Sequence, residues 1–264
     1  MCIYSFYRLY IRGTNPIIKI SNIKKSFSEL KVLDDISFDI NEGEAISVIG
    51  KSGIGKSVLL KHLNGLMYPD SGVISIDNRI VSRMTFFDLE KVRSKISMVF
   101  QFGALFDSMT VGQNIALGLN KMTHLDNSQI RERILQTLEE VGMEGSEDKY
   151  PGELSGGMKK RVGIARAVAV KPKYILYDEP TTGLDPIMTD SINKLISKLH
   201  TLENITSIIV THEMRTVYDV TDRVLMLDNG KIRFDGKSSE IKKSDDLIVN
   251  NFINGNSEKT FHKN

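Results

Sequence analysis

Residues 50–57, GKSGIGKS, decide the fold of this chain. They fit the pattern G-x-x-x-x-G-K-[ST], in which a glycine-rich turn is followed by a lysine and a hydroxyl. The apolar run AISVI at 45–49 precedes them and predicts a buried strand, while SVLLKHLNGLM at 57–67 favours a helix with one apolar face. A strand, a glycine-rich loop and a helix in this order predict a phosphate-binding loop in an α/β fold, although so short a match also arises by chance.

The residue types of this loop suit the binding of a nucleotide. Glycine at positions 50, 53 and 55 lets backbone N–H groups converge on phosphate oxygens without hindrance from a Cβ atom. We expect Lys56 to neutralise the β and γ phosphates and the Ser57 hydroxyl to bind Mg²⁺. The residues expected to contact the nucleotide here are Gly50, Lys51, Ser52, Gly53, Ile54, Gly55, Lys56, Ser57 and Val58.

Other segments predict strands and helices on both sides of the loop. Apolar runs and alternations predict the strands, and the dipeptides Asp77-Asn78 and Asn229-Gly230 favour tight hairpin turns. Expected strands and hairpins lie at 17–20, 32–40, 72–81, 95–101, 174–178, 207–212 and 223–236. Expected helices lie at 130–142, inside a helical insert between Gln101 and Leu154, and at 158–170 and 188–202. We see no internal repeat, so we expect one nucleotide site per chain.

Composition excludes several classes of protein. The 264 residues include 35 basic and 33 acidic side chains, for a net charge of +2, so we expect no nucleic-acid partner. Cys2 is the only cysteine, which excludes an internal disulfide and a cysteine-based metal cluster and fits a reducing compartment. No stretch approaches the roughly 20 apolar residues of a membrane span, and the start of the chain does not fit a signal peptide, because Arg8 interrupts it.

Two acids lie at the carboxyl end of the predicted strand at 174–178. Ligands collect at the carboxyl ends of parallel strands, so Asp178 and Glu179 are placed to act on a bound nucleotide. Asp178 would hold Mg²⁺ through water, and Glu179 would polarise the attacking water. Taken by itself, such a pair is more often part of a solvated loop.

A second glycine turn lies in ELSGGMKKR, residues 153–161. Ser155 suits the N-cap of a helix, and Gly156 and Gly157 leave backbone N–H groups open at the start of that helix. Such a start attracts a phosphate group. In isolation, a helix cap without a ligand is the simpler interpretation.

The order of these motifs resembles the ATP-binding cassette (ABC) family. A phosphate loop, Gln101 after a strand, LSGG, a strand followed by Asp-Glu, GLDP, and His212 after a strand appear in the family's sequence, over residues 17–236. The resemblance implies a P-loop NTPase fold with a RecA-like mixed-sheet core, an antiparallel β subdomain and a helical signature subdomain at about 102–170. Residues 1–16 would be an N-terminal extension, and 237–264 a tail with a short helix and a disordered end.

In this family two cassettes meet head to tail, and the second glycine turn lies at the interface between them. The resemblance implies that Ser155, Gly156 and Gly157 of one copy close over the ATP held by the other. Asp185, in GLDP, would couple the two sites across the interface of the homodimer.

The resemblance also assigns roles to residues that sequence patterns alone leave open. Gln101 would reach Mg²⁺ and the water and report occupancy to the helical insert. His212 would bind the γ-phosphate and orient Glu179, although a loop histidine is ordinarily unremarkable. Phe27 would stack on adenine, unless it belongs to the core. The catalytic set is then Glu179, His212, Gln101 and Lys56, and the metal set is Ser57, Gln101 and Asp178.

Several segments resemble the ATPase subunits of the Mla/MCE lipid-trafficking transporters. These are Met158, where many cassettes have Gln, residues 100–119, and DEPTTGLDPIM at 178–188. That likeness implies a peripheral ATPase on the cytoplasmic face of the inner membrane, with a permease, an MCE-type lipid-binding protein and a small accessory subunit as partners. Candidates for contact with the permease are Phe102, Leu105, Phe106 and Met109, half of which we expect to pack inside the helical lobe.

Three alternatives remain open at this point. The same cassette could serve a transporter of another solute, such as amino acids or metal chelates. A non-transport ABC protein usually has a long coiled-coil insert or two cassettes, whereas only a short interval separates Gln101 from Leu154. A simple P-loop kinase would leave residues 153–161 and GLDP unexplained.

Overall fold

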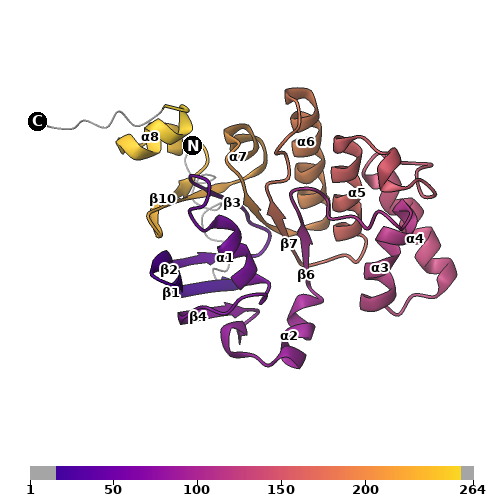
Figure 1. Ribbon diagram of the computed structural model, residues 1–264, viewed down its shortest axis with the longest axis horizontal. Coiled ribbons are helices and arrows are strands. Elements are labelled where there is room, and N and C mark those ends of the chain that lie inside the picture. The colour runs from indigo at the N-terminus through magenta and orange to yellow at the C-terminus, as the bar shows by residue number, and fades with distance from the viewer. Residues whose placement is uncertain (1–15, 257–264) are drawn as a thin grey trace, which may run out of the picture.

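The computed structural model describes residues 16–256, and these form two β-sheets flanked by helices (Figure 1). The proposed N-terminal extension, apart from its last residue, and the last eight residues of the tail lie outside the described part. One sheet is antiparallel, with strand order β2-β1-β4-β5. Its strands are β1 Ile18–Phe27, β2 Leu30–Ile40, β4 Ser71–Ile76 and β5 Arg79–Ile80.

The other sheet is mixed, with strand order β10-β9-β3-β8-β7-β6. Its strands are β3 Ala45–Ile49, β6 Ile96–Val99, β7 Tyr174–Asp178, β8 Thr206–Val210, β9 Arg223–Asp228 and β10 Lys231–Lys237. All its neighbours pair in parallel except β9 and β10, which form an antiparallel hairpin. The expected mixed-sheet core and antiparallel β subdomain are therefore confirmed.

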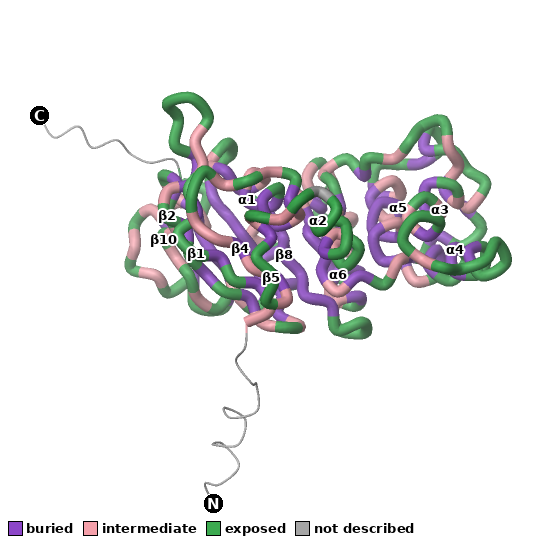
Figure 2. The backbone as a smooth tube through the Cα atoms, turned by 90° about the horizontal axis from the view of Figure 1, so that it is seen from below, coloured by how far each residue is buried: buried purple, intermediate pink, exposed green. Residues whose placement is uncertain are grey.

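Alternation along β7 builds the core on both faces of the mixed sheet. Tyr174 and Leu176 face a cluster shared with α1 (Lys56–Leu63) and the antiparallel sheet. Ile175 and Tyr177 face a second cluster, shared with α6 (Pro186–Glu203) and the helical lobe. Successive side chains of a strand point to opposite faces, so a strand covered on both sides is apolar throughout. In Figure 2 the central strand β8 of the mixed sheet is buried, whereas the strands at the sheet edges, β5 and β10, are not.

The helical lobe contains α3 (Val111–Met122) and α4 (Asn127–Glu140), with α5 (Gly156–Val168) between them and the sheet (Figure 1). Capping boxes at Thr110 and Asp126 start α3 and α4, because each side chain accepts a backbone N–H of the first turn. The lobe thus consists of well-capped helices whose apolar faces join the same cluster as α6.

Three further helices complete the described chain: α2 (Phe86–Arg93), α7 (Met214–Val220) and α8 (Leu247–Ile253). The expected short helix in the tail is α8, and its Val249 is buried with Ile241 and Met226. Within residues 16–256, no helix combines the length and the apolar character needed to cross a bilayer.

Several expected boundaries were wrong. The strand expected at 17–20 extends over Ile18–Phe27, and the strand expected at 207–212 covers Thr206–Val210, so His212 follows it. The helix expected at 57–67 ends at Leu63, because Gly65 has a φ of 67° and turns the chain away from helical geometry. The strand expected at 95–101 covers only Ile96–Val99, so Gln101 lies in a turn after the strand. Both hairpin turns are confirmed, with positive φ at Asp77, Asn78, Asn229 and Gly230.

Candidate active site

The loop of residues 50–55 joins the buried strand β3 to α1, as expected. Gly50 has a φ of 146°, and a Cβ there would lie 2.5 Å from the carbonyl oxygen of Leu227. At Gly55, with a φ of 106°, a Cβ would lie 2.7 Å from Cγ1 of Val32. Both positions therefore require glycine, because the backbone conformation and the close packing exclude a side chain.

The start of α1 is arranged to bind an anion. Its N-cap residue is Gly55, so no side chain accepts a hydrogen bond from the first turn. Gly53, at the outer edge of the loop, has open space where a Cβ would stand. The open N–H groups and the positive end of the helix dipole favour a phosphate at this point.

Lys56 lies under the loop and is only 6% exposed. Its Nζ donates hydrogen bonds to the carbonyl oxygens of Gly50, at 2.8 Å, and Lys51, at 3.1 Å. Burial lowers the pKa of Lys56, and the charges of Glu179 and Asp178 oppose that shift. The ammonium group is thus held beside the loop by two carbonyl oxygens that a phosphate would replace.

Ser57 and Asp178 meet where a magnesium ion is expected. Ser57, in the first turn of α1, donates from Oγ to Oδ1 of Asp178, at the end of β7, over 2.9 Å. Burial raises the pKa of Asp178, while the Ser57 hydrogen bond lowers it and the Glu179 charge adds to the rise. A hydroxyl and a carboxylate oxygen are ligands that Mg²⁺ prefers, and a half-buried carboxylate gains from a nearby cation, so these residues fit the ion.

Glu179 has an unusual backbone conformation. Its φ is 52°, in the left-handed region that residues other than glycine rarely adopt. Its N–H donates to the carbonyl oxygen of Val210 at the end of β8, which fixes this turn to the sheet. Oε2 of Glu179 accepts a hydrogen bond from Oγ1 of Thr182 at 3.0 Å and lies 2.9 Å from Nδ1 of His212.

A cavity of about 430 Å³ brings most of the predicted residues together. It extends from the phosphate loop to the ends of β7 and β8, with Phe27 at its rim. Val32, whose side chain also packs on Gly55, lines the cavity and was not predicted. The lining residues are Phe27, Val32, Ser52, Gly53, Gly55, Lys56, Ser57, Val58, Gln101, Glu179 and His212.

The second glycine turn does not line this cavity. Ser155 is the N-cap of α5 and accepts the Met158 N–H at 3.3 Å, as expected from the sequence. Asp185 likewise caps α6, accepting the N–H groups of Ile187 and Met188 at 2.9 Å. In a single copy of the chain, Ser155 and Asp185 therefore start helices, and neither lines the cavity.

Gly157 and Thr182 have contacts that the sequence did not reveal. Gly157 is buried, and a Cβ there would collide with Cε of Met188 on α6. Thr182, in TTGLDP, holds the carboxylate of Glu179. The one signal in the sequence for this role of Thr182 is its position three residues after Glu179.

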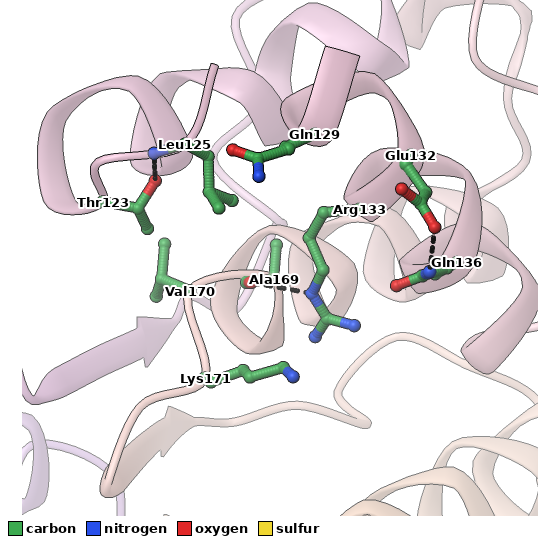
Figure 3. A pocket seen from close by; sticks show the side chains of 9 residues that line it. All are labelled: Thr123, Leu125, Gln129, Glu132, Arg133, Gln136, Ala169, Val170 and Lys171. Carbon is green, nitrogen blue, oxygen red and sulfur yellow. Dashed lines mark hydrogen bonds between the residues drawn. The ribbon is translucent and has the colours of Figure 1, made fainter. Parts of the chain in front are cut away.

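A second hollow, of about 380 Å³, lies in the helical lobe (Figure 3). Its buried polar group is Arg133, which donates to the carbonyl oxygens of Ala169, at 2.9 Å, and Val168, at 3.1 Å, and to Glu140 at 2.8 Å. These carbonyl groups end α5, so Arg133 caps that helix. The guanidinium group therefore stabilises the fold. This hollow shares no lining residue with the cavity at the phosphate loop.

The site and fold together define the class of protein. A glycine loop after a parallel strand of the sheet, with a lysine beneath it and an acid pair at the end of β7, which β8 separates from β3, is the arrangement of the P-loop nucleoside triphosphatases. Comparison with protein families narrows the class, because the family model described as ABC transporter matches residues 33–182, more than half of the chain. The protein belongs to the ABC transporter family.

Two curated relatives show what the chain is similar to. It is 41% identical over 228 residues to the methionine import ATP-binding protein MetN of Carboxydothermus hydrogenoformans, covering 85% of this chain and 67% of the relative. It is 36% identical over 242 residues to the intermembrane phospholipid transport system ATP-binding protein MlaF of Haemophilus influenzae, covering 92% of each.

A solved structure agrees with the fold. The ATP-binding cassette MJ0796, in a dimeric post-hydrolysis state bound to ADP and Pi, superposes with a TM-score of 0.77 and 32% sequence identity. The match covers 84% of this chain and 98% of that one. The likeness supports an ATP-binding cassette fold over most of the chain.

Proposed function

We propose that the protein is the ATP-hydrolysing subunit of a transporter that moves phospholipid between the inner and outer bacterial membranes. It would act as a peripheral homodimer on the cytoplasmic face of the inner membrane, with a permease, an MCE-type lipid-binding protein and a small accessory subunit. The observation that carries the ATPase activity is the cavity that joins the phosphate loop to Gln101, Glu179 and His212. The phospholipid cargo is supported by the similarity to MlaF over 92% of both chains.

Binding of ATP would use the loop and the rim of the cavity. The triphosphate would occupy the open N–H groups of α1 and draw Lys56 from the carbonyl oxygens of Gly50 and Lys51. Phe27, 45% exposed at the rim, offers a ring face for adenine. The loop and the rim thus place Lys56 and Phe27 beside the groups that they are proposed to bind.

Ser57, Asp178 and Gln101 would hold Mg²⁺. When bound, this ion neutralises charge on the β and γ phosphate oxygens. The Ser57 hydroxyl would give up its hydrogen bond to Asp178 in favour of the ion. Gln101 lines the same cavity and would complete the set.

Glu179 would polarise the water that attacks the γ-phosphate. Thr182 and His212 both contact Oε2, so we assign Oε1 to the water. Because Glu179 is held by its backbone, by Thr182 and by His212, the carboxylate needs little reorganisation to reach the reactive geometry. His212 would also donate to the γ-phosphate.

Each composite site would need two copies of the chain. Gly156 is exposed at the start of α5 and has open space around it. The N–H groups there would bind the γ-phosphate held by the other copy. The dimeric state of the related cassette MJ0796 supports this arrangement.

The proposed contact with the permease lies between β6 and the helical lobe. A groove of about 460 Å³ there is lined by apolar residues that include Phe100, Phe106, Met122 and Val170. Phe102 and Phe106 are 79% and 55% exposed, whereas Leu105 packs against the helical core. An apolar groove with exposed phenylalanines suits an apolar helix of a membrane partner.

A second candidate function is import of another solute, because the chain is also similar to MetN. The test is to purify the protein with its membrane partners and to identify co-purified molecules by mass spectrometry. Phospholipid in stoichiometric amount is expected. Methionine or another amino acid in place of lipid would contradict the cargo while leaving the ATPase proposal intact.

A further inference from the structure

Lys160, in the second turn of α5, is a buried charge without an obvious purpose. Its side chain is only 7% exposed, which is rare for a lysine. Nζ donates to the carbonyl oxygen of Gln101 at 2.9 Å. Burial lowers the pKa of Lys160, and the Glu179 charge opposes that shift. Burying an ammonium group costs free energy. We therefore ask what the contact between Lys160 and the Gln101 carbonyl group contributes to the protein.

The contact belongs to a wider attachment of residues 101–104 to α5. Arg166 donates to the carbonyl oxygens of Gly103, at 2.9 Å, and Ala104, at 2.7 Å. Gly163 packs so closely that a Cβ there would lie 3.1 Å from Cα of Gly103. Residues 101–104 and α5 therefore form one packed unit. Lys160 holds the end of this segment that lies nearest the cavity, at Gln101.

Gln101 faces two structures at once. It lines the cavity with Glu179 and His212, while its carbonyl oxygen is bound by Lys160. Lys160 is about one helical turn from the start of α5, where Ser155 is the N-cap. If ligand binding displaced Gln101, Lys160 would move with its carbonyl group. Because α5 is rigid over one turn, the glycine turn at its start would move as well.

We propose that Lys160 is a positioning residue that ties the glycine turn of residues 155–157 to Gln101. A nucleotide in one copy's cavity would then set the position of the turn which that copy presents to its partner. This inference rests on the proposed function. The alternative is that Lys160 only anchors a loop and contributes to stability.

The test compares Lys160→Met with Lys159→Met in the full-length chain. Methionine keeps the length and apolar stem of the buried lysine but removes the donor, and Lys159 is the adjacent, more exposed lysine of the same helix. Three quantities are measured: the affinity for ATP, kcat and KM, and ATP-dependent hydrogen exchange of the amides at 156–161. Exchange is measured at a concentration where gel filtration gives a monomer, so that only coupling within one copy contributes.

For Lys160→Met we expect ATP affinity and KM within threefold of the original chain, kcat reduced at least tenfold, and no ATP-dependent change in exchange at 156–161. Lys159→Met should retain both kcat and that change. Lys160→Arg, which keeps a charged donor, should restore the ATP-dependent change. If Lys160→Met does not fold, Lys160→Gln, with a shorter donor, serves for the same comparison.

A Lys160→Met chain that melts at a lower temperature but keeps the full ATP-dependent change would overturn the inference, because a purely structural lysine behaves in that way. So would an original chain that binds and hydrolyses ATP without any such change. An original chain that neither binds nor hydrolyses ATP would instead contradict the proposed function.

Discussion

Nδ1 of His212 lies 2.9 Å from Oε2 of Glu179, and this contact joins the ends of two neighbouring strands across the candidate site. Glu179 follows β7 and His212 follows β8, so the mixed sheet itself sets their separation. The pair connects the residue proposed to polarise water with the residue proposed to sense the γ-phosphate.

Replacing Glu179 with glutamine should separate ATP binding from hydrolysis. Glutamine keeps the shape of the side chain but cannot polarise water as a carboxylate does, so kcat should fall about 10²-fold or more. ATP affinity should stay within a few-fold, and ATP should shift the variant to a stable dimer in gel filtration. A variant that stays monomeric with ATP would count against the composite site.

His212→Ala should lower kcat about 10²-fold while ATP affinity changes little, because it removes a group that supports the transition state more than the ground state. His124→Ala is the matched control, since His124 is exposed on the helical lobe and should have no effect. Steady-state hydrolysis and a fluorescent-nucleotide titration measure both quantities. Equal activity of the two variants would remove His212 from the mechanism.

Ser155→Arg should bind ATP normally and fail to dimerise. Ser155 caps α5 and lies outside the cavity of its own copy, so a bulky cation there leaves the phosphate loop intact and blocks the approach of a partner. Gel filtration with and without ATP, together with an ATP titration, checks both expectations. Loss of ATP binding in the monomer would show that the turn serves its own copy.

Asp178→Asn should stabilise the chain in the absence of ATP and Mg²⁺, and it should abolish hydrolysis. Burial raises the pKa of Asp178 above the value of 3.8 that it has in the unfolded chain. The native state then binds its proton more tightly, so stability falls as pH rises from below 3.8 through the raised pKa, and the full cost is present above that pKa. At neutral pH the variant should melt a few degrees higher, and the difference should disappear in acid.

Removing Mg²⁺ with EDTA should stop hydrolysis in the original chain.

Gly157→Ala should be less stabilising than Gly156→Ala, because the new Cβ would meet Cε of Met188 and displace that flexible side-chain end, which offsets the gain in helix propensity. Gly156→Ala is the control, since a Cβ there has open space, and it should be neutral or stabilise the helix by up to about 1 kcal/mol. Urea unfolding of both variants, and of Gly157→Ala combined with Met188→Ala, gives a double-mutant cycle. Equal stability of the two glycine variants would contradict the contact.

Local patterns predicted much of this molecule correctly. The strand, glycine loop and helix around residues 50–57 follow from periodicity, and the turns at Asp77-Asn78 and Asn229-Gly230 follow from residues that tolerate positive φ. The shared position of Glu179 and His212 was predictable because both follow strands, and parallel strands end at one edge.

Other features depend on contacts between distant segments, which a single sequence does not show. Lys160 looks like one more surface lysine in MKKR, yet it is buried against Gln101, 59 positions away in the chain. Arg133 reads as an exposed charge on α4, yet it caps α5. The helix expected at 57–67 ended early for a local reason instead, because Gly65 adopts a positive φ just after Leu63.

The central claim is that two copies of this chain enclose each ATP. The most direct measurement is the structure of the Glu179→Gln variant with ATP and Mg²⁺. We predict a head-to-tail dimer in which Oγ of Ser155 and the N–H groups of Gly156 and Gly157 from one copy lie within hydrogen-bond distance of the γ-phosphate held by the other. A nucleotide enclosed by one copy alone, with Ser155 of every neighbouring copy facing solvent, would contradict it.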